Sequence, residues 1–84
     1  GDRRQMDFDV IGDCTTESEW QIQVRNHKDE EVEVELMEPI GADWQILSSS
    51  HRHEKLDAHT FKFTVKVPAH GETTVTYRVR VRWC

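Results

Sequence analysis

The chain has 84 residues, of which 36% are hydrophobic and 32% charged, and its net charge is −5 at pH 7. This length allows one domain with a thin core. The excess of 16 acidic over 11 basic residues argues against nucleic-acid binding, because a duplex requires a net basic surface. No run approaches the roughly 20 apolar residues of a membrane helix, so we expect no direct membrane insertion.

Residues 1–84 are interpreted as a single domain excised from a longer chain. The sequence opens with Gly1-Asp2 rather than Met and shows no signal peptide. We expect any targeting segment to lie upstream.

The first part of the chain contains three predicted strands, at Gln5–Ile11, Glu19–Arg25 and about Glu31–Glu38. In each of them apolar and polar side chains alternate with a period of two, which places one face inside and one in water. A turn at residues 12–16 separates the first two strands. Pro39 ends the third, because its nitrogen cannot donate to a ladder.

The second part contains a shorter strand at Trp44–Ser48 and two clear strands at about Phe61–Val67 and Thr74–Trp83. The last has the most regular alternation, with Val75, Tyr77, Val79 and Val81 on one face. Residues 49–58 lack periodicity and are predicted to form the one long loop. Residues 68–72 are a turn, bracketed by Pro and Gly.

These elements predict an all-β fold, an antiparallel sandwich of six to seven strands that is immunoglobulin-like or fibronectin type III-like. No segment has helical periodicity. The predicted inward set is Phe8, Val10, Trp20, Ile22, Val24, Val32, Val34, Leu36, Ile46, Phe61, Phe63, Val65, Val75, Tyr77, Val79 and Val81.

The number of strands also decides whether the two cysteines, Cys14 and Cys84, can pair. With six up-and-down strands they lie at opposite ends of the sandwich, too far apart for the Cα separation of about 7 Å that a disulfide allows. A seventh strand within residues 49–58 would bring them to the same end. We favour the six-strand arrangement, without an intramolecular bridge, in which an exposed Cys84 could link two chains.

Three stretches resemble a known family. They read Gln-Ile-Gln-Val-Arg-Asn-His-Lys-Asp-Glu from Gln21, Asp-Trp-Gln-Ile-Leu-Ser-Ser-Ser-His from Asp43, and Asp-Ala-His-Thr-Phe-Lys-Phe-Thr-Val-Lys-Val-Pro-Ala-His-Gly-Glu from Asp57, followed by Tyr-Arg-Val-Arg-Val from Tyr77. From about Arg3 to Trp83 the chain is similar to the carboxy-terminal part of the bacterial domain-of-unknown-function family numbered 4139, which includes proteins labelled mucoidy inhibitor A.

This resemblance implies a place in a longer bacterial protein with an export signal, often with a helical or coiled-coil segment before the β region. It implies the periplasm or cell envelope as the location. The family has no established catalytic residues, so none is carried over to this chain.

Three histidines, His51, His53 and His59, fall in the predicted loop together with two carboxylates. Imidazole and carboxylate ligands could hold zinc or copper there. The alternative is an exposed polar loop in which histidines cluster. We favour that alternative and expect neither a metal nor another cofactor.

The last strand carries an arginine stripe on its wet face, formed by Arg78, Arg80 and Arg82. We favour cross-strand ion pairs with the glutamates of the third strand, Glu31, Glu33 and Glu35, if the two strands are neighbours. The alternative is a carbohydrate- or polyanion-binding surface made of this stripe, the His51–His59 loop and an exposed Trp44.

No pattern indicates an enzyme. Ser48, Ser49 and Ser50 precede His51, but adjacency in sequence is no evidence for a triad, and no Gly-x-Ser-x-Gly elbow is present. The sequence therefore favours a non-catalytic structural or protein-interaction module. Its expected partner is the remainder of its parent chain or another envelope protein, and the isolated domain is expected to be a monomer.

Overall fold

The computed structural model describes residues 2–84 and consists of seven strands joined by turns and loops. The strands are β1 (Asp2–Gly12), β2 (Thr15–Arg25), β3 (Val32–Pro39), β4 (Asp43–Ser49), β5 (His53–Asp57), β6 (Thr60–Val67) and β7 (Glu72–Arg82). Within this range no helix is long and apolar enough to cross a membrane.

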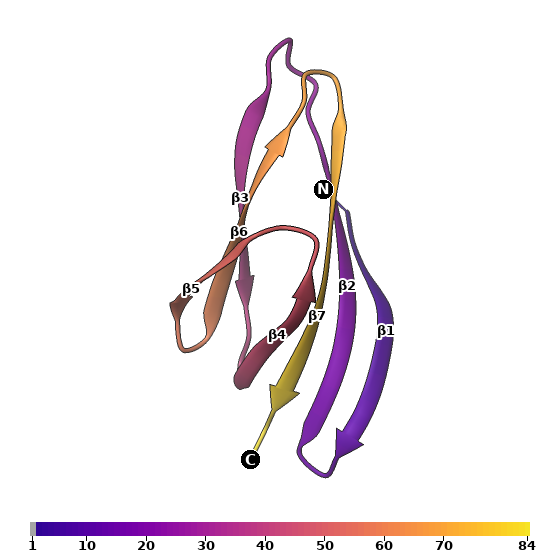
Figure 1. Ribbon diagram of the computed structural model, residues 1–84, viewed down its shortest axis with the longest axis vertical. Coiled ribbons are helices and arrows are strands. Elements are labelled where there is room, and N and C mark those ends of the chain that lie inside the picture. The colour runs from indigo at the N-terminus through magenta and orange to yellow at the C-terminus, as the bar shows by residue number, and fades with distance from the viewer. Residues whose placement is uncertain (1) are drawn as a thin grey trace.

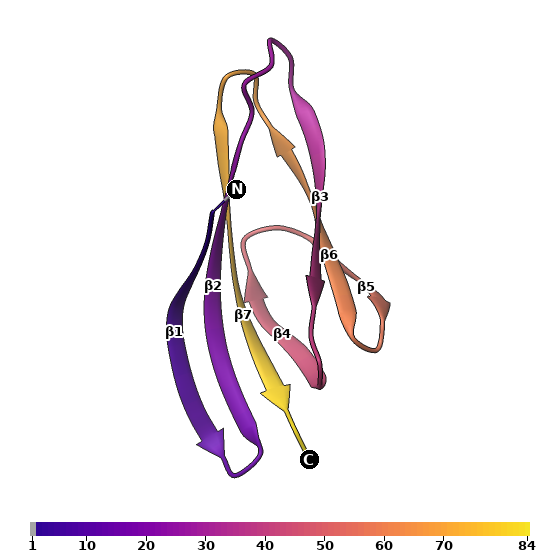
Figure 2. The same cartoon turned by 180° about the vertical axis from the view of Figure 1, so that it is seen from behind.

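The strands form two antiparallel sheets, one with the order β1-β2-β7-β4 and one with the order β3-β6-β5 (Figures 1 and 2). This confirms the predicted all-β sandwich, with the higher of the two expected strand numbers. In the immunoglobulin constant arrangement the fifth strand lies in the four-stranded sheet and the seventh in the three-stranded one. Here these two strands exchange places.

The β2–β7 ladder forms the centre of the larger sheet. Its register runs without interruption from Thr15 opposite Arg82 to Arg25 opposite Glu72. Each row pairs two side chains of the same face, as in Trp20 opposite Tyr77 on the inner face. The alternation read from the sequence is therefore confirmed as one core face and one wet face on both strands.

The core lies between β6 and the β2–β7 ladder. The rings of Phe61, Phe63 and Tyr77 meet there with centroids 5.2 to 5.5 Å apart, a separation that suits aromatic pairs. The buried apolar residues are Ile22, Val24, Phe61, Phe63, Val65, Val67, Val75, Tyr77, Val79 and Val81. Partly buried side chains packed against them include Trp20, Val32, Val34, Leu36, Trp44 and Ile46.

The segment predicted as one long loop contains the seventh strand, β5, which pairs with β6. A register irregularity between Lys55 and Asp57 interrupts its alternation, and all five of its residues are exposed. A short exposed edge strand with a bulge has no apolar periodicity to read. The six-strand arrangement that we favoured for the cysteines was therefore wrong, and the alternative with a seventh strand within residues 49–58 is confirmed.

The prediction of unpaired cysteines was wrong for the same reason. The extra strand places the β1–β2 turn and the end of β7 at one end of the sandwich, where Trp83 N donates to Cys14 O at 2.8 Å. Cys14 and Cys84 form a disulfide with their Cα atoms 5.6 Å apart. No free cysteine remains to link two chains through Cys84.

A third correction concerns Phe8 and Val10, which were predicted to face the core. Both lie on the inner side of the larger sheet but are 54% and 71% exposed. The larger sheet has four strands and the smaller three, and β1 packs mainly against its sheet neighbour β2. Within residues 2–84, the inner face of β1 around Phe8 and Val10 therefore has no second layer over it.

Candidate functional site

The open strand β1 is the main candidate site. All eleven of its residues are exposed, and it carries four of the large apolar side chains left in water by the described chain. These are Met6, Phe8, Val10 and Ile11, between 48% and 71% exposed. Isolated exposed apolar residues are ordinary, whereas neighbouring ones on one face, such as Phe8 and Val10 on the inner face of the sheet, indicate an interaction surface.

The residues of β2 that lie opposite Phe8 and Val10 explain why these two side chains stay exposed. Phe8 lies opposite Ser18, and Val10 lies opposite Thr16. Small polar neighbours on β2 give a large side chain little to pack against. Among the strands of residues 2–84, none pairs with the edge of β1 that faces away from β2.

The other half of β1 is attached to the second sheet by Arg3. Its guanidinium binds Glu38 of β3 at 2.9 Å, donates to the Tyr77 hydroxyl at 3.2 Å and lies 4.4 Å from the Trp20 ring centroid. We call these four residues the Arg3 clamp. Because Arg3 and Glu38 lie in different sheets, the clamp joins the two layers at the β1 edge.

Burial sets the electrostatics of the clamp. Glu38 is only 4% exposed, and this burial raises the pKa of its carboxyl, against the opposing effects of Arg3 and the Tyr77 hydroxyl. Burial and the neighbouring Glu38 charge likewise raise the pKa of Tyr77. A buried carboxylate is tolerated when a cation and hydrogen bonds compensate it, and Arg3 supplies that cation.

The outer face of the same sheet carries an arginine–carboxylate network. Arg78 binds Asp7 at 3.0 Å, Asp9 at 2.8 Å and Glu17 at 3.1 Å. Arg80 binds Glu17 at 2.8 Å. Hydrogen bonds from these arginines lower the pKa values of Asp7 and Glu17, and the carboxylates raise that of Arg78.

The arginine stripe does form cross-strand ion pairs, as predicted, but the predicted partners were wrong. Glu33 and Glu35 belong to β3, which lies in the other sheet from β7, and Glu31 precedes that strand. Glu35 instead binds Lys62 of β6 at 3.3 Å. The sequence could not distinguish these pairings because both strands have a suitably charged wet face.

Replacing Glu17 with glutamine is expected to lower the midpoint of thermal unfolding at pH 7. It is also expected to reduce the fall of that midpoint as the pH is lowered. The pKa values of Asp7 and Glu17 are lowered in the folded chain, so the unfolded chain binds protons more tightly. Stability from these groups is present above their ordinary pKa values of 3.8 and 4.5 and is lost as the pH falls through the lowered ones.

Circular dichroism between pH 7 and about pH 3 measures this effect. Glu33→Gln is the matched control, since Glu33 lies on the wet face of β3 and makes no ion pair within residues 2–84. If Glu17→Gln and Glu33→Gln follow the same curve, the network does not contribute to stability.

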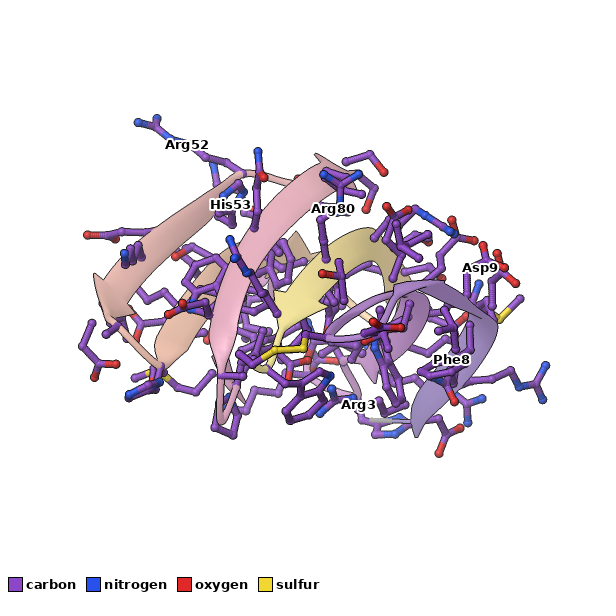
Figure 3. The ribbon with its side chains drawn as sticks, turned by 90° about the horizontal axis from the view of Figure 1, so that it is seen from below. Arg3, Phe8, Asp9, Arg52, His53 and Arg80 are labelled. Carbon is purple, nitrogen blue, oxygen red and sulfur yellow. A yellow bond between two sulfur atoms is a disulfide. The ribbon has the colours of Figure 1, made fainter. Side chains whose placement is uncertain are left out.

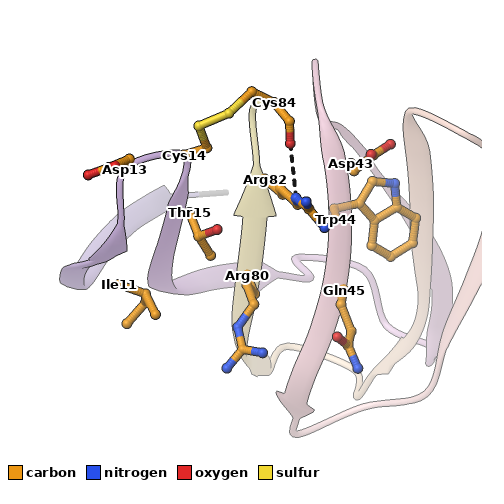
Figure 4. A pocket seen from close by; sticks show the side chains of 10 residues that line it. All are labelled: Ile11, Asp13, Cys14, Thr15, Asp43, Trp44, Gln45, Arg80, Arg82 and Cys84. Carbon is orange, nitrogen blue, oxygen red and sulfur yellow. Dashed lines mark hydrogen bonds between the residues drawn. A yellow bond between two sulfur atoms is a disulfide. The ribbon is translucent and has the colours of Figure 1, made fainter.

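A shallow groove of about 760 Å³ lies on the outer face at the disulfide end, lined among others by Thr15, Gln45, Arg80 and Arg82 (Figure 4). Arg82 Nε donates to the Cys84 carbonyl at 2.9 Å. In the described part of the chain, Arg82 is the one member of the stripe without a carboxylate partner.

Trp44 also borders this groove, but its ring points away from Arg80 (Figure 4). The ring packs on Phe61 with centroids 4.8 Å apart, and its Nε1 donates to the Ala58 carbonyl at 3.1 Å. Lys55 Nζ lies 5.8 Å from the ring centroid. Trp44 is therefore a packing residue rather than the exposed ring that the alternative binding surface requires.

The three histidines do not converge. His51 Nδ1 is 2.8 Å from Ser50 Oγ, His53 lies edge-on to Phe61 and Phe63, and His59 is held through its backbone, whose N–H donates to Asp57 Oδ1 at 2.7 Å. Arg52 and His53 also lie across the molecule from Phe8 and Asp9 (Figure 3). Residues 2–84 contain no group of three or more His, Cys, Asp or Glu side chains that could hold a metal ion.

The predicted carbohydrate- or polyanion-binding set is therefore divided among three places: the arginines on the outer face, Trp44 packed against the core and the histidines near β5. Sequence reasoning missed the Arg3 clamp and the open face of β1. The sequence contains one signal for the clamp: Glu38 follows Val34 and Leu36 at intervals of two residues, so it points to the same inner face. Comparisons with family models, curated proteins and solved structures return no match for this chain.

Proposed function

We propose that this chain is a non-catalytic protein-interaction module that docks a protein partner along β1. The observation that carries the proposal is an 11-residue edge strand with every residue exposed and four large apolar side chains in water. Free strand edges and contiguous apolar side chains are the features by which sheets bind other chains. The net charge of −5 favours a protein over a nucleic acid as the partner.

The setting of the proposal is the bacterial envelope. The resemblance to the carboxy-terminal part of family 4139 supports an exported parent protein, with the partner being the rest of that protein or another envelope protein. The Cys14–Cys84 disulfide supports the same location, because disulfides persist in oxidising compartments such as the periplasm.

Site-specific photo-crosslinking in the producing cell tests the function. A photoreactive benzoylphenylalanine in place of Phe8 is expected to give a discrete crosslinked protein. The same residue in place of Met37 is expected to give none, although the two positions are equally accessible at 54% and 57%. Met37 lies on the outer face of β3, so the pair compares two surfaces at equal exposure.

The mass of the product identifies the partner, since a second copy doubles the mass of the chain and a different protein adds its own. Crosslinks of equal yield at both positions, or none at Phe8, would contradict docking on β1.

A further inference from the structure

We propose that β1 pairs with β1 of a second copy of the chain, in antiparallel register, with Arg4 of each copy facing Asp9 of the other. The inference rests on the proposed interaction function and names its partner. The pair would extend the four-stranded sheet into a continuous sheet through both copies. This departs from the monomer expected from the sequence.

The bulge in β1 makes this register geometrically possible. In a regular strand Arg4 and Asp9 point to opposite faces, because they are an odd number of residues apart. The register shift between Gln5 and Asp7 changes the phase: Arg4 lies opposite Gln21 and Asp9 opposite Glu17. Since Gln21 and Glu17 share the outer face of β2, Arg4 and Asp9 share the outer face of β1.

A two-fold axis at the bulge then matches the two halves of the strand. With Arg4 opposite the second copy's Asp9, Gln5 lies opposite Phe8, and Arg3 lies opposite Val10. All three pairs unite residues of the same face, as an antiparallel ladder requires. The bulge itself, at Met6 and Asp7, falls on the axis, where it interrupts neither half of the ladder.

The charges favour this register over the neighbouring one. Shifting the strands by two residues places Arg4 opposite Asp7 but also places Asp2 opposite Asp9, and like charges directly opposite are destabilising. Arg4 has no carboxylate partner within residues 2–84. Asp9 uses only its Oδ2 atom, which accepts from Arg78 at 2.8 Å, and its side chain is 54% exposed.

The pairing also uses the apolar side chains that the fold leaves in water. Phe8 and Val10 meet Gln5 and the aliphatic part of Arg3 from the second copy, and side chains of this kind can cover apolar surface. The edge of β3 is a poorer candidate, because a symmetric β3 pair sets Glu33 and Glu35 against like charges. One β1 edge per copy gives a closed two-fold dimer rather than a fibre.

Sedimentation velocity over a concentration series tests the dimer, using the unaltered chain and two charge-reversal variants. Arg4→Asp alone and Asp9→Arg alone are each expected to weaken dimerisation by on the order of tenfold or more, since each sets two like-charged pairs face to face. An equimolar mixture of the two variants is expected to restore the dimer. In that mixed dimer both Arg4–Asp9 contacts become opposite-charge pairs again.

Arg52→Asp is the control, because it changes the net charge by the same amount as Arg4→Asp at an exposed position far from β1 (Figure 3). It is expected to leave dimerisation unchanged, and circular dichroism checks that every variant is folded. A chain that stays monomeric at millimolar concentration overturns the second-copy proposal, as does a mixture that fails to recover. A crosslink from Phe8 to a different protein would leave the interaction function standing while overturning the dimer.

Discussion

Replacing Cys14 and Cys84 with serine is expected to lower the free energy of unfolding by about 4 kcal/mol. The two cysteines are 70 residues apart in sequence, so the bond restricts nearly the whole unfolded chain, and the chain-entropy relation for a loop of this length yields that value. Small domains have a total stability of about 5 to 15 kcal/mol. A loss of this size is therefore expected to be a large share of the total stability.

Urea unfolding followed by tryptophan fluorescence measures the loss. The single variants Cys14→Ser and Cys84→Ser, kept reduced, are expected to match the double variant, because either one removes the same bond. The unaltered chain under reducing conditions should match them too. A double variant within about 0.5 kcal/mol of the oxidised chain would contradict the prediction.

The strands that the sequence predicts well are those with one covered and one wet face. The alternation of β7 identifies Val75, Tyr77 and Val79 as inward because β6 lies over them, and they are buried. The same alternation in β1 is misleading. Periodicity reports which face a side chain takes, but whether a second layer covers that face depends on the number of strands in the other sheet.

Pairings between distant strands are the part of the site that the sequence could not predict. The stripe of Arg78 and Arg80 has carboxylates available on either β2 or β3, and only the strand order selects Glu17. Glu38 could have been placed inward by its phase, but its partner Arg3 comes from the far end of the chain and the other sheet. A buried carboxylate indicates that a cation is needed without indicating which one.

Replacing Arg3 with methionine is expected to lower the free energy of unfolding by about 2 kcal/mol at pH 7. Removing one member of a buried ion pair costs about 3 to 5 kcal/mol because the other is left uncompensated. The expected loss is smaller here because the Arg3 side chain is 44% exposed, although the Glu38 side chain is only 5% exposed. Methionine retains much of the packing of the Arg3 stem on Trp20, so the loss reports the charge.

The pH dependence separates this effect from lost packing. Burial already raises the pKa of Glu38 above its ordinary 4.5, and without Arg3 it rises further. Between the ordinary value and the raised one the folded chain binds more protons than the unfolded chain, so stability falls as the pH rises through that window. The deficit of Arg3→Met is therefore expected to shrink as the pH is lowered from 7 toward 4.5, since Glu38 becomes neutral.

A double-mutant cycle with Glu38→Gln completes the test, at a chain concentration low enough to keep β1 unpaired. Glutamine removes the buried charge, so Arg3→Met is expected to cost much less in that background, and the difference is the coupling energy of the pair. Arg4→Met is the matched control, because Arg4 lies on the outer face beside Arg3 without a carboxylate partner in the described chain. Equal losses for Arg3→Met and Arg4→Met would mean that the two sheets are held together at this edge by packing alone. A loss confined to Arg3→Met would mean that the clamp keeps one half of β1 attached to the sandwich while the other half stays open to a partner.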